Sequence, residues 1–308
     1  MVRAVDGVNF TVNKGEPLGL VGESGSGKTV SALSVLGIVP RPGKVVGGRV
    51  IFDGEDLLTK PEKEMRKYRG KRIGYVSQDP NSSLDPLFTI GSQLSEVVQA
   101  HEKVTKERAS EKVLELLQRV RISEPEARMK AYPHELSGGM RQRIAIARAL
   151  AGEPDLLIAD EPTTNLDVTI QAQVLDLLKD LQRELGMTLI LITHDMGIVA
   201  EMTKKVVVLY AGRVAEIAST RETFATPKHP YTSALLKAVP RVDRRKELVP
   251  IGGNIPNLIT PPSGCRFHPR CKFVQEICVA KEPPLEAIGG GREVSCHRWK
   301  EITVEGTS

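Results

Sequence analysis

A glycine-rich run near the start of the chain carries the residue types that hold a chain of phosphates. Positions 22–29 read G-E-S-G-S-G-K-T and fit the pattern G-x-x-x-x-G-K-S/T at every fixed place. Glycines let the backbone curl so that several N–H groups point inward at phosphate oxygens. The lysine would neutralise the β- and γ-phosphates, and the threonine hydroxyl would bind Mg²⁺. The expected nucleotide ligands are Gly22, Ser24, Gly25, Ser26, Gly27, Lys28 and Thr29.

Two carboxylates at the end of a second apolar run would complete this phosphate chemistry. Leu156 to Ala159 is apolar and is followed by Asp160 and Glu161. Ligands of open α/β sheets sit at the carboxyl ends of strands. Asp160 is placed to hold Mg²⁺, directly or through water, and Glu161 can polarise the water that attacks the γ-phosphate. Acids often end strands only as solvated caps, and it is the phosphate loop that favours the catalytic interpretation.

A third motif offers a second phosphate-binding end. It reads Leu136-Ser137-Gly138-Gly139-Met140. Ser137 is a good N-cap, and the two glycines would leave backbone N–H groups exposed at a helix start. An isolated Ser-Gly-Gly is most often a simple helix cap. Here the segment closely resembles the LSGGQ signature of ABC ATPases, and Met in the last place resembles the peptide-importer branch.

The resemblance to ABC ATPases spans residues 4 to 300 and implies roles for further residues. Gln78 matches the glutamine that contacts Mg²⁺ and the attacking water, and His194 matches the histidine that contacts the γ-phosphate. Leu166-Asp167 matches the loop that links the two active sites of a dimer, although Asn165 stands where relatives commonly have a small residue. Relatives also carry an adenine-stacking aromatic residue upstream of Ala4–Val8. This sequence has none there, so we assign no stacking residue and expect a shortened start.

The family pattern also implies partners and a cycle. Two ATPase subunits, identical or different, face each other head to tail. Each ATP lies between the phosphate loop of one subunit and the Ser137-Gly138-Gly139 segment of the other, so that ATP joins the subunits and hydrolysis releases them. The segment Asp79–Ser92 and the helical insertion would pass this motion to two transmembrane permease subunits, which an extracytoplasmic peptide-binding protein supplies.

The C-terminal part narrows the expected substrate. His229-Pro230-Tyr231-Thr232 and the run from Pro262 to Cys271 resemble the tail of di- and oligopeptide importer ATPases. The implied activity is ATP hydrolysis coupled to peptide uptake. Nickel importers share much of this pattern and remain an alternative. A soluble, non-transport ABC ATPase is disfavoured, because the sequence has neither a second cassette nor a long coiled-coil insertion.

All four cysteines lie in this C-terminal part, at Cys265, Cys271, Cys278 and Cys296. Disulfides are disfavoured in a reducing cytoplasm. Structural zinc usually uses tight C-x2–4-C pairs, which are absent here, whereas a four-thiolate 4Fe-4S cluster tolerates wider spacing. We therefore expect a 4Fe-4S cluster, with Zn²⁺ or free thiols as alternatives.

These residues need a scaffold that brings strand ends and helix starts together. Strand-like runs occur at 8–12, 17–21, 49–52, 72–77, 155–159, 188–193 and 205–210. Helical patterns at 29–36 and 170–185 alternate with them, which predicts an α/β fold with a mostly parallel sheet covered on both faces. The resemblance to ABC ATPases implies that this core is of the P-loop NTPase type. The expected parts are a core at 1–84 and 152–219, a helical subdomain at 85–151, and an irregular Cys-containing appendage at 220–308.

Composition agrees with a chain that reaches a membrane only through partners. Of the 308 residues, 40% are hydrophobic, and the net charge is +5. No apolar run approaches the ~20 residues of a membrane-spanning helix, and no signal segment is present. Aromatic residues are 4% of the chain and form no stacking platform, so no nucleic-acid partner is expected. We expect a peripheral location on the cytoplasmic face of the cell membrane.

Overall fold

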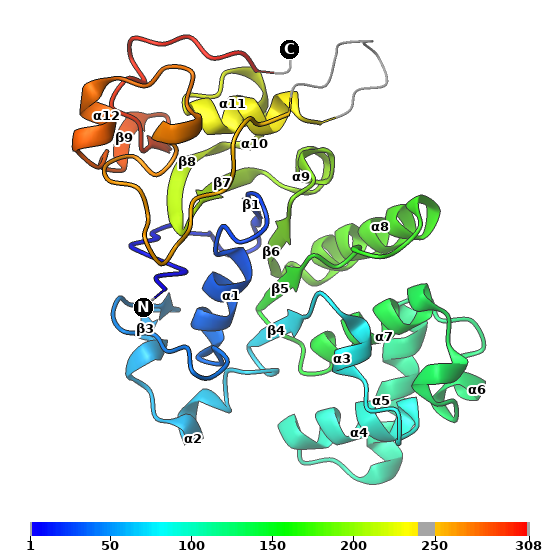
Figure 1. The fold of residues 1–308 in the computed structure, drawn as a ribbon. Coiled ribbons are helices and arrows are strands. Elements are labelled where there is room, and N and C mark those ends of the chain that lie inside the picture. The colour runs from blue at the N-terminus through cyan, green and yellow to red at the C-terminus, as the bar shows by residue number, and fades with distance from the viewer. Residues whose placement is uncertain (1, 240–249, 307–308) are drawn as a thin grey trace. The chain divides into compact units, whose positions relative to one another are not determined.

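The computed structural model describes residues 2–239 and 250–306 and divides into two compact units (Figure 1). Unit 1 consists of Met1–Val12, Pro17–Leu33 and Leu191–Ser308, and unit 2 consists of Asn13–Glu16 and Ser34–Ile190. The phosphate-loop sequence, His194 and the cysteines therefore fall in unit 1. The acidic pair, Gln78 and the Ser-Gly-Gly segment fall in unit 2.

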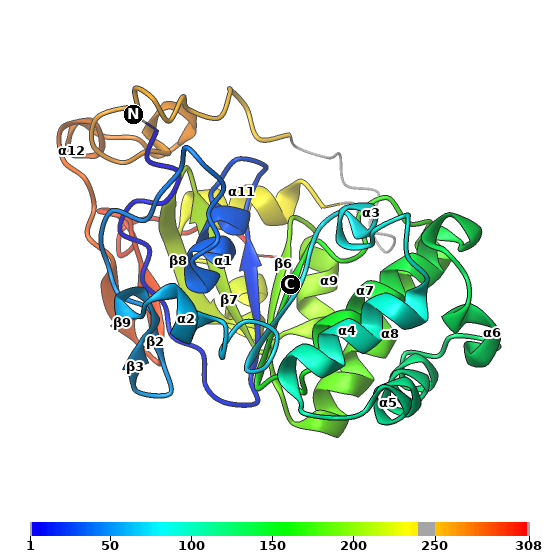
Figure 2. The same cartoon turned by 90° about the horizontal axis from the view of Figure 1, so that it is seen from below.

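Unit 1 is built on a sheet in which strands β1 and β7 lie side by side. β1 (Pro17–Val21) and β7 (Lys205–Tyr210) run parallel. Every residue of β1 and all but the first of β7 are buried, as in a strand that is covered on both faces. The sheet continues antiparallel from β7 in the order β8-β10-β9, and Figures 1 and 2 show β7 beside β8. The added strands are β8 Arg213–Ser219, β9 Glu286–Gly289 and β10 Arg292–Val294.

Unit 1 contains four helices that lie wholly within it among the described residues. They are α9 Met196–Met202, α10 Thr220–Ala225, α11 Pro230–Lys237 and α12 Glu276–Ala280, with a 3-10 turn at His268–Arg270. Helices α9, α10 and α11 begin at residues whose side chains cap them. Asp195 Oδ1 accepts the N–H of Gly197 at 2.7 Å and thereby satisfies a free donor at the start of α9. Ser219 and Glu222 form a capping box at α10. Helix α9 packs against β1, and α10 and α11 pack against β8.

One apolar core joins the sheet of unit 1 to the residues after 219. The rings of Tyr210, Tyr231 and Phe267 are buried, with centroids 4.5 to 5.3 Å apart. Burying a side chain such as Phe267 contributes about 2 kcal/mol relative to leaving it in water. The C-terminal part is therefore held to the sheet by packing as well as by the pairing of β10 with β8.

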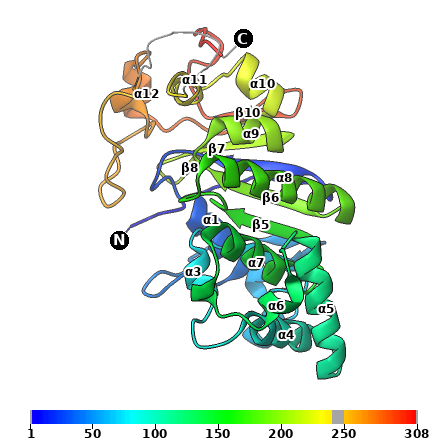
Figure 3. The same cartoon turned by 90° about the vertical axis from the view of Figure 1, so that its right-hand side faces the viewer.

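Unit 2 carries a parallel strand pair and most of the long helices. β4 (Ile73–Val76) and β5 (Leu156–Asp160) run parallel, and the short strands β2 (Ile51–Phe52) and β3 (Glu55–Asp56) form an antiparallel pair. The helices are α2 Glu62–Met65, α3 Pro80–Ser83, α4 Ile90–His101, α5 Lys106–Arg119, α6 Pro125–Met129, α7 Gly138–Leu150 and α8 Val168–Leu185, with 3-10 turns at Leu57–Thr59 and Pro133–Glu135. Helices α4 to α7 pack together (Figure 3).

The long helices of unit 2 follow from their apolar stripes. In α5 the buried positions Ala109, Val113, Leu116 and Leu117 recur every three to four residues. The stripe of α8 ends where Gly186 turns left-handed at φ 59°. Helix α1 (Lys28–Leu36) and strand β6 (Thr188–Thr193) each begin in one unit and end in the other.

Most predicted elements are confirmed. The strands expected at 17–21, 188–193 and 205–210 occur with those bounds, and residues 90–150 are largely helical. The strand expected at 8–12 is wrong, because residues 2–12 form no strand. Val8, Phe10 and Val12 are half-buried and alternate with exposed residues, as in a strand. A strand also needs a hydrogen-bonded partner strand, however. Strand β8 and the antiparallel half of the sheet were not expected.

None of the helices in residues 2–239 and 250–306 combines the length and the apolar character that a membrane crossing requires.

His229 caps α11 from a buried position. Its Nδ1 accepts the N–H of Tyr231 at 3.0 Å, and the side chain is 3% exposed. Burial lowers the pKa of His229 from 6.5 to about 4. Between these two values the unfolded chain binds a proton that the folded chain does not, so the free energy of unfolding falls as the pH falls.

Because of this residue, we expect the free energy of unfolding to fall by up to about 1.4 kcal/mol for each pH unit below its ordinary pKa, down to its pKa in the folded chain. His229→Asn keeps a side-chain acceptor at the cap and removes the titration. Denaturant unfolding at about pH 7 and about pH 5 should show a smaller acid-induced loss for His229→Asn than for the unmodified protein. Equal losses in the two proteins would contradict this assignment.

Candidate nucleotide-binding site

The phosphate loop between β1 and α1 has a backbone that only glycine permits at two places. Gly22 has φ 154° and Gly27 has φ 100°. A Cβ on Gly22 would collide with the carbonyl oxygen of Leu209, and one on Gly27 would collide with that of Ala4. The glycines of the motif are therefore required by close approach of neighbouring backbone as well as by the curl itself.

Lys28 begins α1 and points its ammonium into the loop. Its Nζ donates to the carbonyl oxygens of Gly22 at 2.7 Å and Glu23 at 3.1 Å, and the residue is 5% exposed. Two carbonyl oxygens of the loop thus occupy the ammonium of Lys28, which would bind phosphate oxygens when a nucleotide is present. Buried cations need such partners, and phosphate oxygens are stronger ones.

The remaining loop residues fit a bound anion. Ser24 and Gly25 are exposed at the tip, and Thr29 is half-buried in the first turn of α1. Ser26 Oγ is buried and has no hydrogen-bond partner among the described residues. A buried hydroxyl without a partner is costly, and a phosphate oxygen would satisfy it. The N-terminus of α1 adds the positive end of its dipole.

In unit 2 the acidic pair lies at the end of β5 as predicted. Asp160 is fully buried, and Tyr75 donates its hydroxyl to Asp160 Oδ2 at 3.0 Å. Burial, followed by the nearby carboxylate, raises the pKa of Tyr75, so its hydroxyl stays a donor. Tyr75 was missed from the sequence, although its place on β4 opposite Ile158 is what sets this contact.

The structure brings Glu161 and Gln78 together. Gln78 Nε2 donates to Glu161 Oε2 at 3.2 Å, and the hydroxyl of Thr164 donates to the same oxygen at 2.9 Å. Glu161 has φ 45°, in the left-handed region that non-glycine residues rarely adopt. Such conformations concentrate at functional sites, because surrounding contacts must hold them. Thr164 was not predicted as part of this group.

The Ser-Gly-Gly segment forms an exposed helix start. Ser137 Oγ accepts the N–H of Met140 at 3.3 Å and caps α7, and both Ser137 and Gly138 are exposed. Gly139 is required for packing, since a Cβ there would lie 2.6 Å from Ile170 Cγ2 on α8. The first N–H groups of α7 therefore lie at a surface, as a second phosphate-binding end requires.

Two further predicted positions have local roles. Asp167 caps α8 by accepting the N–H of Ile170 at 3.0 Å. Asn165 has φ 68°, a conformation that asparagine adopts more readily than most residues. In unit 1, His194 follows the last residue of β6 and is exposed.

Comparison with known proteins decides between the possible phosphate-binding families. Residues 5–164 match the family model described as ABC transporter. The chain belongs to the ABC transporter family. As a member it is an ATPase built on the family's P-loop α/β fold. Residues 215–278 match a second model, the C-terminal region of oligopeptide/dipeptide transporters.

Relatives in this family match nearly the whole chain. A probable peptide ABC transporter ATP-binding protein of Sinorhizobium fredii is 52% identical over 98% of this chain and 91% of its own length. The oligopeptide transport ATP-binding protein OppD of Salmonella typhimurium is 48% identical over 96% of this chain and 88% of its own. The dipeptide transport ATP-binding protein DppD of Escherichia coli is 45% identical over 96% and 90%.

Solved ABC cassettes share the fold. The dimeric cassette MJ0796, bound to ADP and Pi in a post-hydrolysis state, superposes with a TM-score of 0.63. It is 30% identical, and the match covers 71% of this chain and 91% of that one. The cbiO1 protein of Clostridium perfringens gives a TM-score of 0.62 at 32% identity, over 72% of this chain and 84% of that one.

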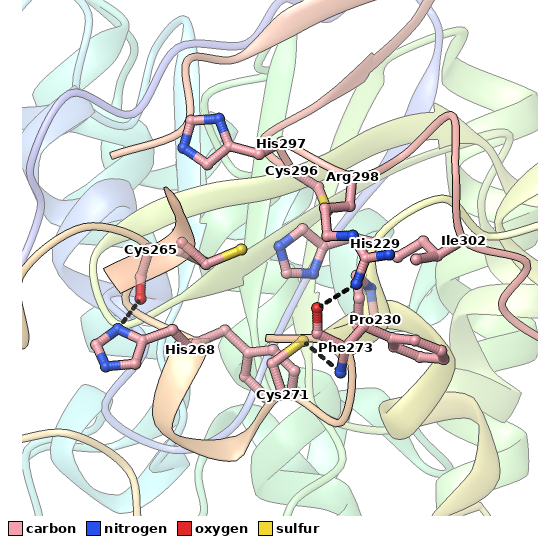
Figure 4. A pocket seen from close by; sticks show the side chains of 12 residues that line it. His229, Pro230, Cys265, His268, Cys271, Phe273, Cys296, His297, Arg298 and Ile302 are labelled. Carbon is pink, nitrogen blue, oxygen red and sulfur yellow. Dashed lines mark hydrogen bonds between the residues drawn. The ribbon is translucent and has the colours of Figure 1, made fainter. Parts of the chain in front are cut away.

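The four cysteines line one pocket of unit 1, together with His229 and Phe267 (Figure 4). Burial raises the pKa of Cys265 to about 11 and that of Cys296 to about 12. Within residues 2–239 and 250–306, however, no three His, Cys, Asp or Glu side chains are arranged to hold a metal ion. The expected four-thiolate centre is therefore not formed in this structure, and its thiols are free.

We expect Tyr75→Phe to leave the Asp160 carboxylate less firmly positioned, because this buried carboxylate loses the hydrogen bond from the Tyr75 hydroxyl. Losing such a bond should slow Mg²⁺-dependent ATP hydrolysis by about threefold to tenfold and raise the Mg²⁺ concentration for half-maximal rate. Tyr68→Phe is the matched control, since Tyr68 donates its hydroxyl to Glu55, an exposed residue. Equal rates for both variants would remove Tyr75 from the site.

Proposed function

We propose that this chain is the ATP-hydrolysing subunit of an importer of di- and oligopeptides. The observation that carries the proposal is the match of residues 215–278 to the C-terminal region of oligopeptide/dipeptide transporters. Relatives that cover nearly the whole chain carry names for peptide transport. A nickel importer is the alternative, and uptake assays separate the two.

The phosphate loop holds the triphosphate of ATP. Lys28 exchanges its bonds to loop carbonyls for bonds to the β- and γ-phosphates, and Ser26 gains a partner for its buried hydroxyl. Mg²⁺, when bound, supplies a Lewis acid to the phosphate oxygens. The residues present for it are Thr29, Gln78 and Asp160, whose oxygens suit a hard cation.

Hydrolysis is assigned to Glu161. Its carboxylate polarises the attacking water, and the amide of Gln78, already bonded to that carboxylate, orients the water. Thr164 fixes the same carboxylate oxygen. His194 contacts the γ-phosphate, and its exposed place at the end of β6 leaves the ring accessible.

The helix start at Ser137-Gly138-Gly139, where Ser137 and Gly138 are exposed, supports a head-to-tail dimer. Its N–H groups bind the phosphates that the loop of a second ATPase subunit carries, whether that subunit is identical or different. The segment Asp79–Ser92 contains the exposed residues Leu87 and Phe88 and contacts two transmembrane permease subunits. The chain then lies on the cytoplasmic face of the membrane, and an extracytoplasmic peptide-binding protein supplies the substrate.

We expect Glu161→Gln to keep ATP binding and to abolish most turnover, by about 100-fold or more, because the amide cannot polarise water. The protein should then accumulate as an ATP-bound dimer, detectable by light scattering after size-exclusion chromatography. Unchanged hydrolysis in this variant would remove Glu161 from its role. Copurification from native membranes with two permease subunits, and ATP-driven uptake of labelled dipeptides by the reconstituted complex, tests the importer itself. Uptake of nickel without peptide would establish the alternative.

We also propose that the cysteine pocket takes a 4Fe-4S cluster, with Zn²⁺ as the alternative. The supporting observation is that four thiols from separate segments border one cavity. Four sulfurs match the donor set of such a cluster. A bound cluster would hold together the separate segments that carry the four thiols.

Anaerobic purification should therefore give a brown protein with about four iron atoms per chain and broad visible absorption. Cys278→Ser should lose the iron, because it removes one of the four thiolate ligands. A colourless, iron-free protein with stoichiometric zinc would establish the zinc alternative. Four titratable thiols and no metal would exclude both.

A further inference from the structure

Arg270, from the C-terminal part of the chain, forms an ion pair with a residue of the phosphate loop. Nη1 and Nη2 donate to the two carboxylate oxygens of Glu23 at 2.7 Å and 3.0 Å. The same guanidinium donates to the carbonyl oxygens of Gly252 at 2.8 Å and Ile251 at 3.2 Å. Its side chain is 3% exposed. A bidentate pair between a planar guanidinium and a carboxylate fixes the orientation of the two side chains and also neutralises their charges.

Glu23 is the loop residue directly after Gly22, and its backbone is held as well. Its N–H donates to the hydroxyl of Tyr231 at 2.9 Å, and its carbonyl accepts from Lys28 Nζ at 3.1 Å. Tyr231 is fully buried in the core of unit 1. Glu23 is therefore anchored at its carboxylate and its N–H by two side chains that lie beyond residue 219.

The charge of Glu23 gives this anchoring a consequence for ATP. A carboxylate in the second position of an anion cradle repels a triphosphate unless a cation compensates it. The only cation that ion-pairs with Glu23 among the described residues is Arg270. Because Arg270 is nearly buried and also bonded to backbone oxygens, that compensation persists when a nucleotide is absent.

The same segment holds the other end of the loop. Arg266 donates to the carbonyl oxygen of Ala211 and to the carboxylate of Asp6. The next residue of that turn, Gly212, donates its N–H to the carbonyl oxygen of Ser26 at 2.9 Å. Cys265 and Cys271 bracket the two arginines in sequence. The cysteine pocket and the phosphate loop are thus linked through seven consecutive residues, 265–271.

We propose that Arg270 is a positioning residue of the ATP site, which neutralises Glu23 and fixes the phosphate loop, so that segment 265–271 sets the affinity for the nucleotide phosphates. This inference rests on the proposed role of residues 22–29 in holding those phosphates.

Isothermal titration of the full chain with ATP tests the proposal. Arg270→Gln should raise the Kd by about tenfold, while kcat at saturating ATP stays within about twofold. Arg270→Lys should bind ATP more tightly than Arg270→Gln, because it keeps the positive charge but lacks the bidentate geometry. In Glu23→Gln/Arg270→Gln the uncompensated carboxylate is gone, and Kd should return to within about threefold of the unmodified protein.

A tail anchor without a role in ATP binding predicts something different. Arg270→Gln would then bind ATP with the Kd of the unmodified protein, and that result would overturn the proposal. A double variant that binds no better than a weakened Arg270→Gln would overturn it as well, because the loss of affinity would then not come from the charge of Glu23. Lys272→Gln is the matched control, because it removes a positive charge from an exposed neighbour and should leave Kd unchanged. If Arg270→Gln fails to fold, Tyr231→Phe, which keeps the buried ring and loses the acceptor for Glu23, should raise Kd severalfold, and an unchanged Kd would contradict the proposal.

Lys28→Ala separates this inference from the proposed site. If Lys28→Ala binds ATP like the unmodified protein, the phosphate loop is not the site, and both proposals fail. If Lys28→Ala loses binding while Arg270→Gln keeps it, the loop is the site and only the role of Arg270 is wrong.

Discussion

The curl of the phosphate loop is the constraint on which the rest of unit 1 depends. Neighbouring backbone approaches so closely at Gly22 and Gly27 that neither position admits a Cβ. This closeness comes from the β7 end and from the N-terminal segment, and it leaves loop carbonyls facing the ammonium of Lys28. The loop is therefore held in a form that can exchange its own oxygens for those of a phosphate, without first having to fold around it.

A similar principle operates in unit 2. Glu161 keeps a left-handed backbone, and its carboxylate is held by Gln78 and Thr164. Asp160 next to it is buried and accepts a bond from Tyr75. The two adjacent acids thus have different surroundings, since Asp160 is fully buried and Glu161 is half-buried. Different surroundings are what let two carboxylates take different roles.

Much of this arrangement could be predicted from the sequence, and the reason is physical. The glycine loop, the acids after an apolar strand and the Ser-Gly-Gly cap are local patterns whose chemistry depends on residues a few positions apart. Tyr75 and Thr164 could not be predicted in this way, because their roles come from strand pairing and from a backbone turn. The pairing of β10 with β8 likewise depends on contacts between residues about eighty positions apart. Arg270 and Glu23, separated by 247 positions, were beyond any local pattern.

The prediction for the cysteines was also limited by what residue spacing can indicate. Their spacing indicated four thiols that could meet, and the structure does bring them to one cavity. Spacing could not indicate how closely the sulfurs approach, which depends on loops at Cys265–Cys278 and near Cys296. Segment 265–271 lines the cavity through its cysteines and contacts the phosphate loop through Arg270, so both contacts restrict which residues it can contain.

A crystal structure of the full chain with a slowly hydrolysed ATP analogue and Mg²⁺ tests the central claim most directly. The account predicts the β- and γ-phosphates on the backbone N–H groups of residues 24–29, with Lys28 Nζ turned from Gly22 and Glu23 toward them. A nucleotide bound elsewhere, with Lys28 still bonded to those two carbonyl oxygens, would contradict it.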